Sequence, residues 1–256
     1  RYQPISPALV SLLIREDISG LHGLRVHAGI WLTDANGNRY DTAPGELQFS
    51  GNSLSGIPAL QLSGQAAVLL KSASPEEASR LAVHLDFFPE YPDVGTLLEE
   101  VRRAISFKTL SLDTSFSSFR PSEHPAERPA KETVKELLRG LVHEKLIPVI
   151  LQKCCPDSLT ASLPFSDDTL ERLGRLLKNF PLTVIGTKPF KEAQVTHGGV
   201  GAEQLKPHSL EVSSVPGLYL AGEIVNVDGL CGGYNLHFAW GSGIQAAKEI
   251  IRAQNQ

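Results

Sequence analysis

Hydrophobic and polar residues alternate along the first quarter of the chain, which is typical of β-strands. The alternation is clearest over residues 24–33, where every even position is apolar. A period of two turns successive side chains to opposite faces of a sheet, so this segment predicts a half-buried strand. Asn36-Gly37 favours a tight hairpin turn that leads to a return strand near residues 39–42. Further strands are expected at residues 46–49, 59–62 and 65–70.

Apolar residues with helical spacing dominate the middle of the chain, residues 75–180. Ser74-Pro75 followed by Glu77 has the form of a capping box with proline at the first helical position. Helices with one apolar face are also expected after Asp93, around residues 134–142 and after Ser166. A short strand near residues 83–88 and a Ser/Pro-rich linker or long loop at residues 106–130 would interrupt these helices.

The last part of the chain, from residue 182, returns to mixed α/β character. Residues 218–221 form a compact apolar run that predicts a buried parallel strand. A glycine-rich loop follows this run, and a helix is expected from about Tyr234 to Arg252. The pattern therefore predicts a fold that combines α+β and α/β parts.

Composition narrows the class of protein. The chain has 256 residues, of which 41% are hydrophobic and 20% are charged, and its net charge is −4. It is too apolar to be disordered, and it has no basic character that would favour nucleic acid. Its apolar runs are far shorter than the roughly 20 residues that a bilayer requires. We therefore expect a soluble, cytoplasmic protein without a nucleic-acid or membrane partner, whose oligomeric state the sequence leaves open.

Methionine is absent from the sequence, which instead starts at Arg1. A core of this size normally uses several methionine side chains to fill gaps. We therefore expect either that Arg1 follows a cut or deletion, or that methionines have been lost from the recorded sequence.

Common catalytic and metal-binding motifs do not occur in the sequence. His143-Glu144 has no second histidine four residues after the first, so a zinc-protease helix is excluded. Cys154 and Cys155 are adjacent, whereas zinc and thioredoxin-like sites need two residues between their cysteines. We therefore predict no metal site.

Glycines and polar residues cluster between residues 217 and 236. Gly222 ends the predicted strand and would let a ligand approach the backbone, and Glu223 would then stand at the carboxyl edge of the sheet. Gly232-Gly233 leads into the last predicted helix, whose N-terminal N–H groups favour negative charge on a bound ring. The same glycines would also suit an ordinary strand–loop–helix unit in which they serve only the turns.

Four motifs in this region resemble the C-terminal flavin-binding part of the BaiN-like (YhiN-like) NAD(P)/FAD-dependent flavoproteins. They are Val195 to Val200, Val215 to Glu223, Asp228 to Leu236, and Trp240-Gly241-Ser242-Gly243. Residues 45–49 and 54–63 are similar to the β-rich middle segment of that family, and the similarity is weakest over residues 75–180.

The resemblance implies a Rossmann-like FAD-binding domain that is discontinuous in sequence. Residues 1–14 would be a connector from this domain, and residues 15–190 would form an inserted β-rich and helical domain on the substrate side. Residues 191–256 would complete the FAD-binding domain.

The resemblance also implies an oxidoreductase in which FAD passes hydride from NAD(P)H to a small-molecule substrate. Glu223 would bind a hydroxyl group of the cofactor. The implied cofactor-binding residues are Gly222, Glu223, Asp228, Gly232, Gly233, Tyr234, Asn235 and Leu236. No residue stands out as a catalytic acid or base.

Several departures from the family pattern keep a second hypothesis open. The family's N-terminal G-x-G-x-x-G turn has no counterpart, because residues 199–204 lack the last glycine. Cys231 stands where many relatives have threonine, and His197 replaces a usually small residue. His197 and His237 either face the flavin or substrate, or are ordinary packed or exposed residues. The alternative is an inactive fragment without FAD that serves only in folding, substrate recognition or interaction.

Overall fold

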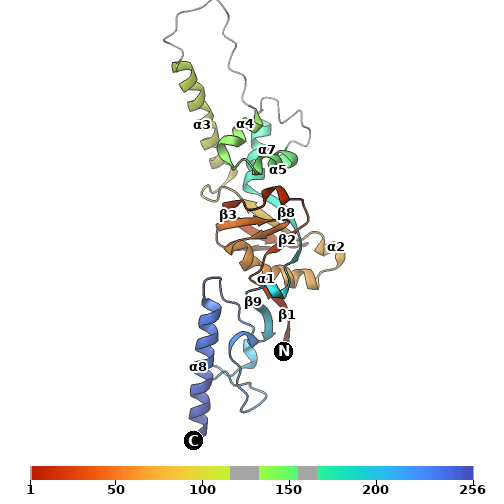
Figure 1. Ribbon diagram of the computed structural model, residues 1–256, viewed down its shortest axis with the longest axis vertical. Helices are drawn as coiled ribbons and strands as arrows, with labels where there is room; N and C mark the ends of the chain where they lie inside the picture. The colour runs from red at the N-terminus through yellow and green to blue at the C-terminus, as the bar shows by residue number, and fades with distance from the viewer. Residues whose placement is uncertain (1, 116–132, 155–165, 256) are drawn as a thin grey trace, which may run out of the picture. The chain divides into compact units, whose positions relative to one another are not determined.

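The computed structural model describes residues 2–115, 133–154 and 166–255 (Figure 1). The chain forms two compact units. Unit 1 combines Arg1–His84 with Pro181–Gln256, and unit 2 is Leu85–Phe180. The assignment of residues 15–190 to one inserted domain stays a prediction.

A seven-stranded sheet forms the centre of the first part of unit 1, in the order β4-β3-β5-β6-β2-β8-β7. A further pairing between β3 and β7 joins the sheet back onto itself. The strands are β2 (Leu12–Ile14), β3 (Arg25–Thr33), β4 (Arg39–Asp41), β5 (Gly45–Ser50), β6 (Ser53–Ser55), β7 (Ala82–Asp86) and β8 (Phe180–Thr187). Fully buried side chains such as Leu12, Leu32 and Phe49 fill its core. The predicted hairpin is confirmed, with Gly37 at φ 82° in the turn between β3 and β4.

The two strands predicted at residues 59–62 and 65–70 are wrong, because these residues form one helix, α1 (Ile57–Ser72). A short apolar run fits a buried strand and a buried helix equally well, and here the two runs form one helix. Pro58 occupies the first helical turn, and Ala59, Leu62 and Ala66 are buried at helical spacing. Alanine and leucine are also strong helix formers. Helix α1 packs against the seven-stranded sheet and against β1.

A second, two-stranded sheet pairs the start of the chain with a segment near residue 200. Strand β1 (Tyr2–Ala8) pairs antiparallel with β9 (Val195–Val200), and Ser6 lies opposite His197. The short helical turns of unit 1 are η1 (Ser19–Leu21), α2 (Pro75–Ala78), η2 (Phe190–Glu192), η3 (Ala202–Gln204) and η4 (Gly222–Ile224). The predicted capping box of Ser74 and Glu77 is confirmed in α2.

The buried parallel strand predicted at residues 218–221 is wrong. Leu218 is 44% exposed, and Tyr219 makes only an isolated antiparallel bridge with Glu211. The parallel bridge in this region joins Val200 to Val225, four residues beyond the predicted strand. Val225 packs with Leu205 and Val212 in a small separate core. The buried residues of this segment therefore lie outside the apolar run.

The last helix of unit 1, α8 (Tyr234–Gln254), agrees with the predicted bounds to within two residues. Its buried residues are Ser242 and Ala246. Leu236, Trp240 and Ile244 stand four residues apart and are exposed, with Trp240 at 73%. One face of α8 is therefore apolar but open to solvent.

Unit 2 is helical, with α3 (Val94–Ser115), α4 (Val134–Leu141), α5 (Leu146–Cys154) and α7 (Asp167–Lys178). The predicted caps are confirmed, since Asp93 Oδ1 accepts from the Thr96 N–H and Ser166 Oγ accepts from the Thr169 N–H. The linker predicted at residues 106–130 is wrong up to Ser115, because α3 continues to that residue. Its remainder lies outside the described residues.

In the parts of the chain that the structure describes, no helix is both long and apolar enough to cross a bilayer.

The junction between β6 and α1 yields a stability prediction. Gly56 has φ 95° and ψ 157°, and a Cβ atom there would collide with the Glu46 carbonyl oxygen. We expect Gly56→Ala to lower the free energy of unfolding by at least about 3 kcal/mol, because backbone strain and overlap add. The control is Gly23→Ala, at φ 77° with no atom within 4 Å of the new Cβ. It should cost about 1–2 kcal/mol in urea unfolding, and equal losses would contradict the argument.

Candidate functional site

The loop before α8 is closed by one side chain. The Gly229 N–H donates to Asn235 Oδ1 at 2.8 Å, and Asn235 Nδ2 donates to the Gly229 carbonyl oxygen at 3.0 Å. The start of the loop is thereby held against the first turn of α8. Gly232 and Gly233 have φ 122° and 97°, a region that glycine adopts without strain.

The N-terminus of α8 is available to a ligand. Gly233 is the N-cap and supplies no side chain, and the first turn contains no acidic residue. A helix leaves its first N–H groups without intrahelical partners, and these groups carry partial positive charge. The arrangement favours an acceptor or anion at this point.

Glu223 lies opposite, in η4. Its carboxylate accepts a hydrogen bond from the Thr196 N–H, so it is tied to strand β9. Gly222 has φ 70°, and its N–H donates to Ser242 Oγ of α8 at 2.9 Å. The turn that carries Glu223 is therefore fixed to both β9 and α8.

These elements surround a cavity of about 350 Å³, which we call the ring pocket. Five of the eight residues predicted to bind cofactor line it: Glu223, Gly232, Gly233, Asn235 and Leu236. Leu9, Gln194, Val195, Thr196, Val227, Phe238 and Ala239 complete the lining. Of the other three predicted residues, Gly222 supports the turn, Tyr234 is exposed and Asp228 lines a second cavity. The cofactor-binding role of all eight stays a prediction.

The second cavity has a volume of about 190 Å³ and holds Asp228 and His197, so we call it the histidine pocket. His197 Nδ1 and Asp228 Oδ2 form a hydrogen-bonded ion pair. This hydrogen bond to Asp228 raises the pKa of His197 above its ordinary value of 6.5, although burial and the charge of Lys71 oppose it.

Strand β9 contributes side chains to both cavities. Thr196 lines the ring pocket and its neighbour His197 lines the histidine pocket, as the alternation of side chains along a strand requires. Leu9 and Val195 line both. Leu9 is a buried non-glycine residue at φ 48°, an uncommon backbone conformation that indicates local constraint.

Sequence reasoning missed the contribution of α1 to the histidine pocket. Leu60, Gln61, Gly64 and Gln65 line it, and the prediction of strands over these residues hid their common face. A Cβ atom on Gly64 would lie 3.3 Å from His197 Nδ1, so glycine makes room for the imidazole. The matching motif around His197 was the only available signal.

Comparison with known proteins identifies the family of this chain. The HI0933-like protein Rossmann domain matches residues 24–249. The chain belongs to this family. The match agrees with the mixed α/β fold, while the finer placement among BaiN-like flavoproteins and the missing N-terminal segment stay predictions.

Individual relatives of this HI0933-like chain are reductases and synthases by name. It is 33% identical over 250 residues to a 3-dehydro-bile acid delta(4,6)-reductase of Clostridium scindens, which covers 96% of the chain and 53% of the relative. The ribosomal RNA dihydrouridine synthase of Escherichia coli is 41% identical over 70 residues, 27% of this chain and 18% of that protein. The corresponding enzyme of Haemophilus influenzae is 33% identical over 113 residues, 44% of this chain and 28% of that protein. The chain thus spans about half the length of the bile acid reductase.

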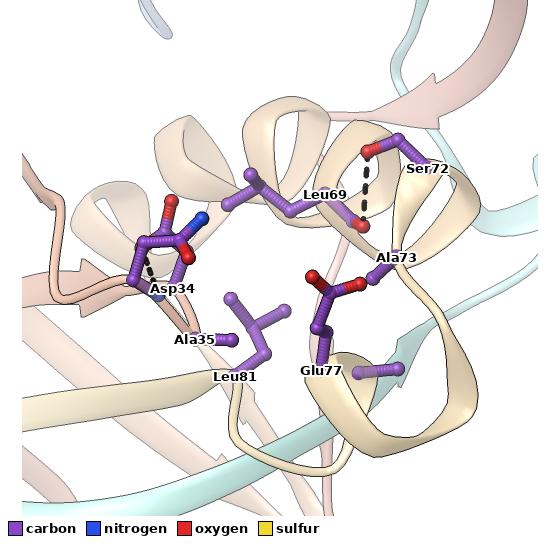
Figure 2. A pocket seen from close by; sticks show the side chains of 9 residues that line it. Asp34, Ala35, Leu69, Ser72, Ala73, Glu77 and Leu81 are labelled. Atoms are coloured by element: carbon purple, nitrogen blue, oxygen red, sulfur yellow. Dashed lines mark hydrogen bonds between the residues drawn. The ribbon is translucent and has the colours of Figure 1, made fainter.

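A further cavity of about 150 Å³ lies between the β3–β4 turn and the end of α1 (Figure 2). Its two carboxylates already have local partners. Asp34 Oδ1 accepts from the Asn36 and Asn38 N–H groups, and Glu77 accepts from the Ser74 N–H. These contacts shape a turn and a helix cap, so this cavity is not the candidate site.

Other candidate residues of the HI0933-like chain take no part in the two pockets. His237 is exposed on α8, and Cys231 has a free, partly exposed thiol. Among the described residues, no group of three histidine, cysteine, aspartate or glutamate side chains is placed to hold a metal ion. Cys155 lies outside the described residues.

The closed loop yields a prediction at Asn235. We expect Asn235→Ala to lower the free energy of unfolding by about 1–3 kcal/mol, because it removes both hydrogen bonds to Gly229. Hydrogen exchange at the Gly229 amide should accelerate. Asn255→Ala, at the exposed C-terminal end of α8, is the control and should leave this amide unchanged. Unchanged Gly229 exchange in Asn235→Ala would show that the loop is held by other contacts.

The ion pair yields a pH prediction. A raised pKa in the folded state means that His197 contributes stability fully below pH 6.5, and loses it as the pH rises through the folded pKa. We expect Asp228→Asn to flatten this part of the stability–pH curve. Urea unfolding at pH values on both sides of the window measures it, with His27→Gln as the exposed control. Parallel curves for wild type and Asp228→Asn would refute the pair's contribution.

Proposed function

We propose that this chain is part of a FAD-dependent oxidoreductase of the BaiN-like flavoproteins. The flavin would pass hydride from NAD(P)H to a small-molecule substrate. The observation that carries the proposal is the ring pocket, in which the open N-terminus of α8 and the Glu223 carboxylate face one cavity.

The lining of the ring pocket fits the edge of a flavin ring. Val227, Leu236 and Phe238 offer apolar surface to a flat ring, and the N–H groups after Gly233 suit its N1–C2=O edge. Glu223 would accept a hydrogen bond from a cofactor hydroxyl. When bound, FAD supplies the hydride chemistry, and these residues orient it and tune its ring.

The substrate class is suggested by the names of the relatives. A delta(4,6)-reductase and a dihydrouridine synthase are both named for the saturation of carbon–carbon double bonds. We propose the same class here, the reduction of a double bond conjugated to a carbonyl group. Because the chain spans about half of the bile acid reductase, this activity is proposed for the whole protein of which the ring pocket is a part.

One observation favours the alternative, a chain without bound FAD. The loop after β9 is the nearest counterpart of a phosphate-binding turn. The Glu203 carboxylate lies against Gly201, where a phosphate would have to approach, and like charges repel. This loop therefore does not serve as a pyrophosphate cradle, and the affinity for FAD would rest on the ring pocket.

Flavin binding decides between the two. We expect the purified chain to take up added FAD and to show the yellow flavin bands in its visible spectrum. Glu223→Ala should weaken binding at least about tenfold, because a hydrogen bond to a charged group is lost. The control is Glu192→Ala, an exposed residue of η2 outside both pockets, which should bind like wild type. A chain that stays colourless in excess FAD would contradict the proposed binding of FAD in the ring pocket and would support the alternative.

A further inference from the structure

The histidine pocket is a second site next to the ring pocket, and of the eight predicted cofactor-binding residues Asp228 alone lines it. Leu9 and Val195 line both cavities, so the two cavities adjoin at these side chains. A substrate that extends from the histidine pocket past Leu9 and Val195 would therefore reach a ring held in the ring pocket. The side chains of His197 and Asp228 are 18% and 32% exposed, so the pair is accessible from the cavity but largely sheltered.

The pair leaves one imidazole nitrogen for a ligand. Asp228 takes Nδ1 and so fixes the ring's tautomer and orientation, and Nε2 is the other nitrogen. Gly64 of α1 makes room for the ring on one side, and β1 runs along β9 with Ser6 opposite His197. This is the arrangement of a histidine positioned by a carboxylate for proton transfer.

The charges around His197 favour its protonated form. Asp228 faces it from the loop before α8 and raises its pKa, while Lys71 of α1 lowers it through its positive charge. The Lys71 ammonium is itself directed to the Ile5 carbonyl oxygen of β1, at 2.5 Å. Ser6 and Ala8, the β1 residues nearest this end of β9, carry no charge.

The remaining walls suit a conjugated carbonyl compound. Ala8, Leu9 and Leu60 are apolar, and Gln61 and Gln65 offer side-chain amides. Gln61 Oε1 already accepts a hydrogen bond from Thr42 Oγ1 at 2.8 Å, so its Nε2 group is the end that remains to donate. A carbonyl oxygen is the natural acceptor for such a donor.

We infer that His197 is the proton donor of the reduction and that Asp228 is its positioning residue. This inference rests on the proposed function. When bound and reduced, FAD would supply the hydride, which would form a C–H bond at one carbon of the substrate double bond while the π bond breaks. The proton on His197 Nε2 would form the second C–H bond at the carbon next to the carbonyl group. This would leave the cofactor oxidised and the imidazole neutral, and water would return a proton to the imidazole.

The first experiment asks whether the pocket brings a substrate to His197. We use the full chain labelled with ¹⁵N-histidine and 2-cyclohexen-1-one as the probe. The imidazole ¹⁵N signals of His197 should shift on titration, and those of the exposed His27 should not. A probe that leaves His197 unchanged, or moves both histidines equally, overturns the inference.

The second experiment measures two half-reactions of the chain loaded with FAD. His197→Gln should slow the reoxidation of reduced flavin by 2-cyclohexen-1-one roughly 100-fold, the usual effect of losing a general acid. Reduction of the flavin by NADPH or NADH should stay near the wild-type rate. His27→Gln is the control for both.

The pH profile separates proton donation from a structural role. The wild-type reoxidation rate should fall as the pH rises through the pKa of His197. In Asp228→Asn this fall should move to lower pH, because the hydrogen bond that raises the pKa is gone.

The outcomes are distinct. If the chain takes up no FAD, the proposed function fails and the donor role fails with it. If His197→Gln reoxidises as fast as wild type, the inference is overturned while the proposed function stands.

Discussion

The site depends on the close approach of three backbone segments around Gly198 and Gly199. A Cβ atom on Gly198 would collide with the Pro4 carbonyl oxygen of β1, and one on Gly199 with the Ile224 carbonyl oxygen after Glu223. The Asn226 N–H also donates to the Val200 carbonyl oxygen at 2.8 Å. Strand β9 is thereby wedged between β1 and the segment that carries Glu223 and Asp228. Any side chain at either glycine would separate the elements from which both pockets are built.

The position of β9 between these two segments explains why one short strand lines two cavities. Consecutive residues of a strand point in opposite directions, so Thr196 and His197 face different neighbours without any loop between them. Thr196 meets Glu223 through its N–H, and His197 meets Asp228 through its ring. Glu223 and Asp228 lie five positions apart in sequence, on a segment that makes a parallel bridge with the end of the strand between Val200 and Val225. One carboxylate thus lines each cavity.

The sequence was most informative where the signal is local. Helix caps at Ser74, Asp93 and Ser166, and the start of α8, depend on neighbouring residues and were predicted correctly. The run from Leu218 had the composition of a buried strand, but it is half-exposed and pairs only through an isolated bridge with Glu211.

The residues of the two pockets also differ in whether they are close together or far apart in sequence. Five of the twelve residues that line the ring pocket were among those predicted to bind cofactor, because they fall close together in sequence between Glu223 and Leu236. The histidine pocket as a whole was not predicted, because it needs α1 beside β9. Gly64 and His197 are far apart in sequence, and only the folded chain places them together.

The exposed face of α8 has a consequence for dynamics. A helix with Ser242 and Ala246 as its buried residues gains little from tertiary packing, and such helices belong to the low-stability end of a protein's local openings. The N–H groups that line the ring pocket are the first turn of this helix. A ligand bound there would therefore also suppress the opening of α8, and part of its binding free energy would be consumed in ordering the helix. Occupancy of the pocket and protection of the α8 amides from exchange are thermodynamically linked quantities.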